Sequence, residues 1–99
     1  MLYMIIGRDH EDSLDARSAS REDHLIRMHL LRDSGRLVLA GPLPAIDALD
    51  PGPAGFDGSL IVAEFDSLEE ARLWAEADPY LHGGAWREVE VRPFRQVLP

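Results

Sequence analysis

The sequence predicts an α+β domain in which a four-stranded antiparallel sheet carries two helices on one of its faces. Three observations lead to this fold class. The 99 residues suffice for one hydrophobic core, so we expect one domain over residues 1–99. Four short segments have the apolar or alternating pattern of strands, and two longer segments repeat apolar residues at helical spacing. They follow one another in the order β-α-β-β-α-β, which is typical of a ferredoxin-like sheet.

A polar stretch separates the first strand from the first helix. Residues 2–7 are apolar on both faces and predict a strand. Residues 8–19 are mostly polar or charged, and we expect them to form an exposed loop. The helix then begins at Ser20, whose hydroxyl can cap the free amides of the first turn. It ends at Gly35, because glycine tolerates the left-handed conformation found at helix ends.

A connection rich in proline and glycine lies between the second and third strands. Residues 37–40 predict the second strand, which Gly41 and Pro42 bring to a halt. Residues 43–58 hold three prolines and three glycines among few apolar residues, so we expect a long loop. Loops of this length in small domains are usually functional or flexible and are seldom simple connections. Residues 60–65 predict the third strand.

The last third of the chain predicts a helix and a strand. Ser67, followed three residues later by Glu70, forms a capping box that opens the second helix. Pro79 disfavours helical geometry at the preceding Asp78, so the helix should stop there. Residues 86–97 alternate apolar and charged side chains over much of their length and predict the final strand.

The predicted sheet leaves one apolar face uncovered. Residues 4–6 and 60–63 are apolar on both faces, whereas two helices cover only one face of a four-stranded sheet. An apolar patch of that size is rarely left in water by a monomer. A second copy of the chain is the simplest cover, and the sequence therefore predicts a homodimer that packs sheet against sheet.

Composition excludes several classes of function. The formal net charge is -8 and the positive residues are scattered arginines, so we expect neither nucleic acid nor an anionic membrane as a partner. The absence of cysteine excludes disulfides, a thiol nucleophile and a zinc-thiolate site. The opening apolar segment lacks the features of a signal peptide, and no apolar run is long enough to span a bilayer. We therefore expect a soluble cytoplasmic protein.

The four histidines do not form a metal-binding pattern. His24 and His29 belong to the same predicted helix, where a spacing of five residues sets the two rings about 140° apart. The remaining two, His10 and His82, lie far away in sequence. We expect no structural or catalytic metal.

His24 and Asp78 are the candidate catalytic residues. His24 shares the apolar side of its helix with Leu25 and Met28, where a histidine can act as a general acid or base at neutral pH. The same position also suits a partly buried histidine held by a local hydrogen bond. Asp78 lies at the end of the second helix, where a negative charge is mildly unfavourable and a positive or polar partner is favoured. A carboxylate of this kind can orient a histidine, although it can equally be a solvated residue at a helix end.

Five further residues are candidates for binding a ligand. Arg21 precedes His24 by one helical turn and can project to the same side, where it would hold an anionic group. Such an arginine is also common as a solvated surface residue. The other candidates are Ser20, Gly41, Pro42 and Tyr80.

Several short motifs occur in order along nearly the whole chain. They are Arg21-x-x-His24-Leu25, Leu31-x-x-x-Gly35-Arg36-Leu37, Ala40-Gly41-Pro42, Gly55-Phe56-x-Gly58-Ser59, Ala77-Asp78-Pro79-Tyr80 and Val91-Arg92-Pro93-Phe94. Together they resemble the YciI-like (YCII-related) proteins. The histidine on the first helix, the Ala-Gly-Pro motif and the Asp-Pro-Tyr motif carry most of that resemblance.

The resemblance implies a ferredoxin-like fold that dimerises through its sheet, as in the dimeric α+β barrels. It also implies a pocket with a His-Asp pair, carried here by His24 and Asp78. Most of the family has no established reaction. Some relatives are associated with eliminating hydrogen halide from chlorinated aromatic compounds, and the wider superfamily includes muconolactone isomerases.

Two hypotheses of function follow. The first is a small enzyme of lyase or isomerase type, in which His24 and Asp78 form a dyad that moves a proton on a small organic substrate without a cofactor. The second is a non-catalytic module that uses the same pocket to hold a small ligand or an interaction partner.

Overall fold

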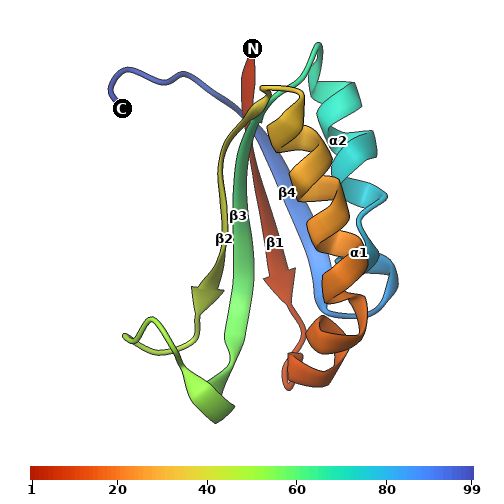
Figure 1. The fold of residues 1–99 in the computed structure, drawn as a ribbon, viewed down its shortest axis with the longest axis vertical. Helices are drawn as coiled ribbons and strands as arrows, with labels where there is room; N and C mark the ends of the chain where they lie inside the picture. The colour runs from red at the N-terminus through yellow and green to blue at the C-terminus, as the bar shows by residue number, and fades with distance from the viewer.

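The computed structural model describes residues 1–99 and confirms the predicted antiparallel sheet with helices on one face (Figure 1). The sheet has the order β2-β3-β1-β4, so the first and third strands are central and the second and fourth are edges. Every neighbouring pair is antiparallel. The elements are β1 (Leu2–Asp9), α1 (Leu14–Asp33), β2 (Leu37–Pro44), the 3-10 helix η1 (Gly52–Ala54), β3 (Phe56–Glu64), α2 (Leu68–Glu76), α3 (Pro79–His82) and β4 (Trp86–Phe94).

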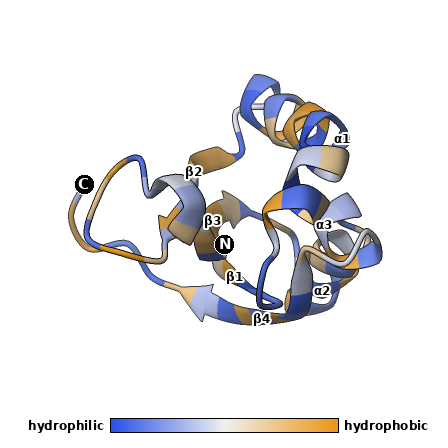
Figure 2. Ribbon diagram, turned by 90° about the horizontal axis from the view of Figure 1, so that it is seen from below, coloured by the Kyte–Doolittle hydropathy of each residue, from blue (hydrophilic) through white to orange (hydrophobic).

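The hydrophobic core lies between the sheet and the three α-helices, which gather on one side of the strands (Figure 2). The strands have one buried face because successive side chains point to opposite sides of the sheet. In β1 the residues accordingly alternate between half-buried and buried along the whole strand. Tyr3 and Ile5 belong to the buried set and contribute to the core, together with Trp86 at the start of β4. The ring of Trp86 leaves no room for a Cβ atom at Gly7, so only glycine fits at that position of β1.

Local signals in the sequence correctly placed two helix boundaries. The Ser67 side chain accepts a hydrogen bond from the Glu70 amide at 3.1 Å, so it is the N-cap of α2. Gly35 has a φ of 75°, and the next amide, that of Arg36, donates to the carbonyl of Leu31 at 3.1 Å. Both bonds satisfy backbone groups that a helix end would otherwise leave unpaired.

The predicted exposed loop over residues 8–19 is wrong. β1 continues to Asp9 and α1 begins at Leu14, with Ser13 as its N-cap residue. Ser20 therefore lies within the helix and does not cap it. The prediction failed because it took polar residues to be solvated, whereas Asp9 and Arg17 are buried as a mutually neutralising pair.

The predicted strand ends in the middle of the chain also need correction. β2 does not stop at Gly41 and Pro42 but continues through them to Pro44, paired with β3. An edge strand tolerates this proline because a missing N–H on its outer side removes no ladder hydrogen bond. β3 begins at Phe56, which shortens the connection from the predicted residues 43–58 to residues 45–55.

The opposite face of the sheet carries no helix. On the two central strands it is formed by the side chains that alternate with the core set, among them Met4, Ile6 and Leu60. On the edge strand β2 it continues with Leu39 and Leu43, which are 47% and 38% exposed. None of the helices has the length and apolar composition required to cross a membrane.

Candidate functional site

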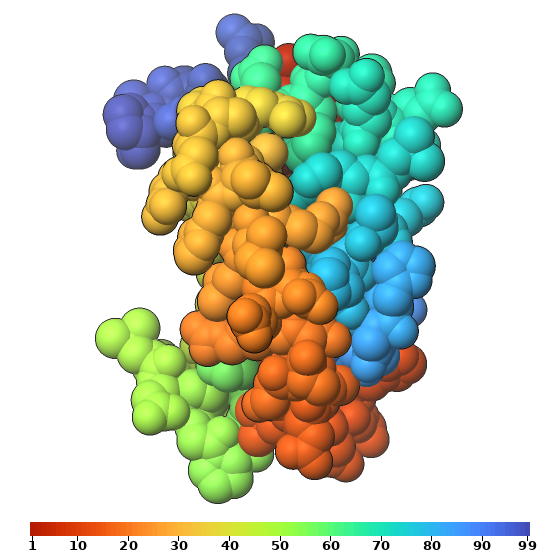
Figure 3. Space-filling view, turned by 45° about the vertical axis from the view of Figure 1, so that its right-hand side comes forward, coloured from red at the N-terminus to blue at the C-terminus, as the bar shows by residue number.

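A cavity of about 420 Å³ lies between the inner side of α1 and the β2–β3 part of the sheet. The molecular surface is hollowed between α1 and the light-green segment that follows β2 (Figure 3). The lining includes His24 and Arg21 from α1, Pro42 from β2, Ser59 from β3 and Tyr80 from α3. This volume falls within the range of about 300–1,000 Å³ found for small-molecule sites.

The structure brings His24 and Asp78 together, 54 positions apart in sequence. The Nδ1 atom of His24 lies 2.9 Å from Oδ1 and 3.0 Å from Oδ2 of Asp78. The histidine is 7% exposed and the aspartate is completely buried. A carboxylate buried to this extent requires partners for its charge, because burial without them would cost several kcal/mol.

Asp78 is held by two groups in addition to His24. Its Oδ1 accepts a hydrogen bond from the amide of Tyr80 at 2.9 Å, which makes Asp78 the N-cap of α3. Asp78 is non-helical, as expected before Pro79, and α2 stops just before it at Glu76; Asp78 then opens a new helix, so its expected place at the carbonyl end of α2 is corrected. The carboxylate thus accepts from the free amide of Tyr80 at the start of α3 instead of meeting the carbonyl end of a helix.

Arg27 is the third partner of Asp78, and the sequence reasoning missed it. Its Nη1 donates to Oδ2 of Asp78 at 2.9 Å, and its Nη2 donates to the carbonyl of Trp74. The guanidinium also lies over the ring of Trp74, 4.2 Å from the ring centroid. The spacing was informative, because position 27 is three residues after His24 and therefore on the same side of α1.

These contacts assign the two ring nitrogens of His24 different roles. Asp78 faces an arginine and a backbone donor as well as the ring, so it is an ionised acceptor and Nδ1 of His24 carries the proton. The lone pair of neutral His24 is therefore on Nε2, which has no hydrogen-bond partner within the protein. A histidine in this tautomer can accept a proton at Nε2 while its cationic form is stabilised at Nδ1.

Tyr80 packs directly on the imidazole. The two rings stack with centroids 4.0 Å apart and planes 12° apart, and Trp86 meets both rings edge-on. Burial raises the pKa of the Tyr80 phenol, although the nearby cations of Arg17 and Arg21 act in the opposite direction. The hydroxyl therefore stays protonated through the neutral range and remains available as a hydrogen-bond donor at the cavity.

Arg17 also lines the cavity, and the sequence did not identify it as a site residue. Its Nε and Nη2 donate to the two carboxylate oxygens of Asp9 at 2.6 and 2.9 Å, and Nη2 also reaches the Gly58 carbonyl and Ser59 Oγ. The guanidinium lies 5.1 Å from the Tyr80 ring centroid. One signal was present in the sequence. A stripe along α1 recurs at spacings of three and four residues, and it comprises Leu14, Arg17, Arg21, His24, Met28 and Leu31.

The structure divides the residues predicted to bind a ligand. Arg21, Gly41, Pro42 and Tyr80 all line the cavity. Ser20 does not, because its hydroxyl lies against Gly83 and leaves no space for a Cβ atom there. Ser20 thus belongs to the contact between α1 and α3, and its assignment to the ligand site is corrected.

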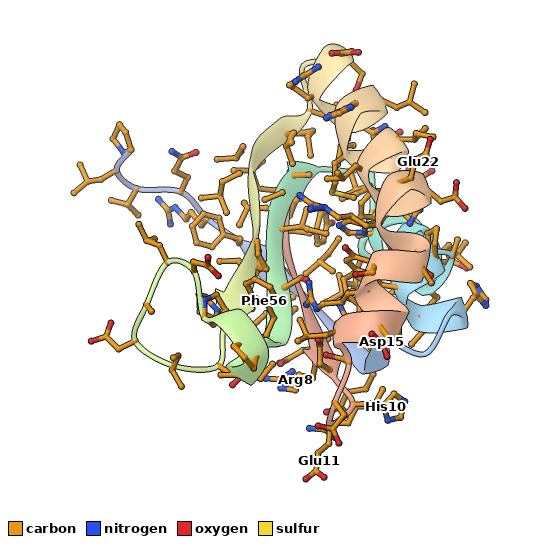
Figure 4. All side chains as sticks on the ribbon, turned by 60° about the horizontal axis from the view of Figure 1, so that its bottom comes forward. Arg8, His10, Glu11, Asp15, Glu22 and Phe56 are labelled. Carbon is orange, nitrogen blue, oxygen red and sulfur yellow. The ribbon has the colours of Figure 1, made fainter.

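The histidines and acidic residues form no cluster with the geometry of a metal site. His10 lies beyond the end of β1, and Glu22 points away from the sheet on the outer side of α1 (Figure 4). No group of three or more His, Cys, Asp or Glu side chains is placed to hold a metal ion.

Comparison with known proteins shows the family to which the chain belongs. The family model described as the YCII-related domain matches residues 1–95. This chain belongs to the YCII-related family. Protein YciI of Escherichia coli is 54% identical over 98 residues, which cover 99% of this chain and 100% of that protein. An uncharacterised protein of Haemophilus influenzae is 44% identical with the same coverage.

The chain is also similar to a solved structure of an enzyme whose reaction is named. It is the 5-chloro-2-hydroxyhydroquinone dehydrochlorinase TftG of Burkholderia phenoliruptrix, in complex with 2,5-dihydroxybenzoquinone. The TM-score is 0.81 at 25% sequence identity, and the match covers 96% of this chain and 94% of TftG. The family resemblance drawn from the sequence motifs is thus confirmed.

Proposed function

We propose that this member of the YCII-related family is a small, cofactor-independent enzyme of lyase or isomerase type, in which His24 transfers a proton on a small organic substrate. The observation that carries the proposal is the hydrogen bond from His24 Nδ1 to the buried carboxylate of Asp78. This bond leaves Nε2 as the basic nitrogen of a residue that lines the cavity.

The proposed step begins with a substrate whose C–H bond is next to a carbonyl or an equivalent acceptor. Nε2 of His24 takes the proton, and the bonding electrons move onto the substrate oxygen to form an enolate. In an isomerisation the His24 imidazolium returns the proton to a different carbon. In an elimination the enolate expels a leaving group with its electron pair, and His24 passes the proton to water. Asp78 stabilises the imidazolium in both cases.

The relationship to TftG supports this reaction class. TftG is a dehydrochlorinase, and removing hydrogen chloride from an organic molecule requires the loss of a proton as well as of chloride. The similarity extends over almost the whole of both chains. The substrate of TftG is not carried over, because substrate choice depends on individual side chains around the cavity.

We also propose that the protein acts as a homodimer. No helix covers the apolar side chains on the other face of the sheet. They lie on three neighbouring strands: Met4 and Ile6 on β1, Leu60 on β3, and Leu39 and Leu43 on β2. Pairing two such faces would remove this apolar surface from water, and each Å² of apolar surface buried stabilises the dimer by about 25 cal/mol. A second copy is favoured as the occupant because one patch is then covered by an identical, equally apolar patch.

Proton exchange provides a test that can be run before the substrate is identified. A panel of small carbon acids is incubated in D₂O with the protein, and loss of each C–H signal is followed by NMR. We expect at least one compound to exchange, and His24→Asn to slow that exchange at least about 100-fold, as is typical for removing a general base. His10→Asn is the matched control, because His10 lies away from the cavity (Figure 4).

Two results would contradict the proposal. One is exchange that His24→Asn leaves unchanged. The other is a ligand that binds in the cavity, shown by shifts at His24 and Tyr80, while no compound of the panel ever exchanges a proton or forms a product. The second result would instead favour the non-catalytic binding module.

A further inference from the structure

We infer that the natural ligand of this cavity is a small organic monoanion whose charged end binds Arg21 and whose apolar body lies farther along α1, beyond His24. This inference rests on the proposed function only in placing the ligand in the same cavity. It adds the charge, the orientation and the anchoring residue of that ligand.

The charge of the cavity is opposite to that of the protein. The chain has 18 acidic residues and a net charge of -8, yet no aspartate or glutamate lines the cavity. The lining instead contains three arginines, Arg17, Arg21 and Arg32, in addition to two histidines. A cationic hollow in an acidic protein selects negatively charged small molecules, because the rest of the surface repels them.

Pairing leaves one of these charges without a partner. Arg17 is neutralised by Asp9, at 2.6 Å, and the exposed Arg32 has Asp33 at 3.2 Å. Behind the lining, the Asp78 carboxylate is matched by Arg27. Arg21 is exposed at the cavity and forms no hydrogen bond or ion pair within the protein, so it is free to bind one negative group of a ligand.

The helix places Arg21 at a useful distance from the base. Each residue of an α-helix rises about 1.5 Å, so Arg21 stands about 4.5 Å before His24 along α1. Both residues also face the same side of α1 and line the cavity, so a ligand whose carboxylate binds Arg21 can extend toward His24. A carbon of that ligand is acidic when it is next to a carbonyl or conjugated with one, which suits the proposed proton transfer.

Beyond His24 the buried part of the lining is apolar, whereas His29 and Arg32, which also line this end, are exposed. Met28 lies one helical turn beyond His24 and lines the cavity together with Leu37 and Ile61 from the sheet. An aromatic or alkenyl body fits there without leaving a polar group unpaired. Near the charged end, the protonated hydroxyl of Tyr80 supplies a donor for a second oxygen atom of the ligand.

Benzoate and benzamide are the probes that test this inference, since they differ in charge and hardly in shape. Binding to the whole protein is measured by NMR titration at constant ionic strength, with inorganic phosphate as a third probe. We expect benzoate to bind at least tenfold more tightly than benzamide, and also more tightly than phosphate, which has no apolar body. We expect Arg21→Gln to weaken benzoate binding at least fivefold and to leave benzamide binding unchanged.

Arg72→Gln is the matched control, because it removes the same charge from an exposed position of α2 outside the cavity. Equal binding of benzoate and benzamide would overturn the inference, as would equal losses in the two arginine variants. Phosphate binding as tight as that of benzoate would show a general anion site instead. The probes do not react, so the preference should survive in His24→Asn. Failure of proton transfer is therefore distinguished from failure of the charge selection.

Discussion

Replacing Asp78 with asparagine tests the centre of the site without any substrate. The substitution keeps the shape of the side chain and an oxygen that can accept from the Tyr80 amide. It removes the charge that Arg27 and His24 share. Because Asp78 is fully buried, neither partner can replace the lost carboxylate with bulk water at that point.

The size of the effect follows from the burial of the two partners. Removing one member of a buried ion pair costs about 3–5 kcal/mol, because the other charge is left uncompensated. The Arg27 side chain remains 19% exposed, so water reaches part of it and the loss should lie near the lower end, at about 3 kcal/mol. For a domain with a typical stability of about 5–15 kcal/mol, this is a large fraction.

Urea unfolding followed by tryptophan fluorescence and circular dichroism is the assay. We expect Asp78→Asn to lower the free energy of unfolding by about 3 kcal/mol with an unchanged m-value. Asp57→Asn is the control, since Asp57 is exposed and unpaired, and it should change stability by less than about 0.5 kcal/mol. Combining Asp78→Asn with Arg27→Met should recover part of the loss, because the stranded cation is then removed. A loss below about 1 kcal/mol, or losses that simply add, would refute this account of the site.

Two further predictions concern Tyr80 and the open face of the sheet. Because burial raises the pKa of Tyr80 above its ordinary value of 10.0, the phenol stabilises the fold fully below that pH and loses its contribution as the pH rises through the higher folded value. The free energy of unfolding, measured across the alkaline range, should thus fall less steeply with pH in Tyr80→Phe than in the wild type. Identical slopes in the two proteins would contradict this. Light scattering at micromolar concentration should give twice the chain mass for the wild type and a single chain mass for Ile6→Glu. Ile26→Glu, on the outer side of α1, should stay dimeric, and a monomeric wild type would remove the basis of the dimer proposal.

The sequence by itself determined those features whose cause is local. Ser67 and Gly35 mark helix boundaries because each satisfies backbone groups only a few residues away. The order of strands and helices follows in the same way from the spacing of apolar residues. His24 was identified because it interrupts an apolar stripe, and Asp78 because it precedes a proline within a motif of the family.

Only the tertiary structure decided which polar residues are buried. Asp9 and Arg17 look like exposed loop residues in sequence, and they are buried because α1 packs its first turns over β1 and β3. The partnership of Arg27 with Asp78 spans 51 positions and depends on how α1 meets the start of α3. Polarity along the chain does not reveal whether a charge faces water or an opposite charge. That outcome is set by packing at long range, because desolvation is tolerated only where a partner is already in place.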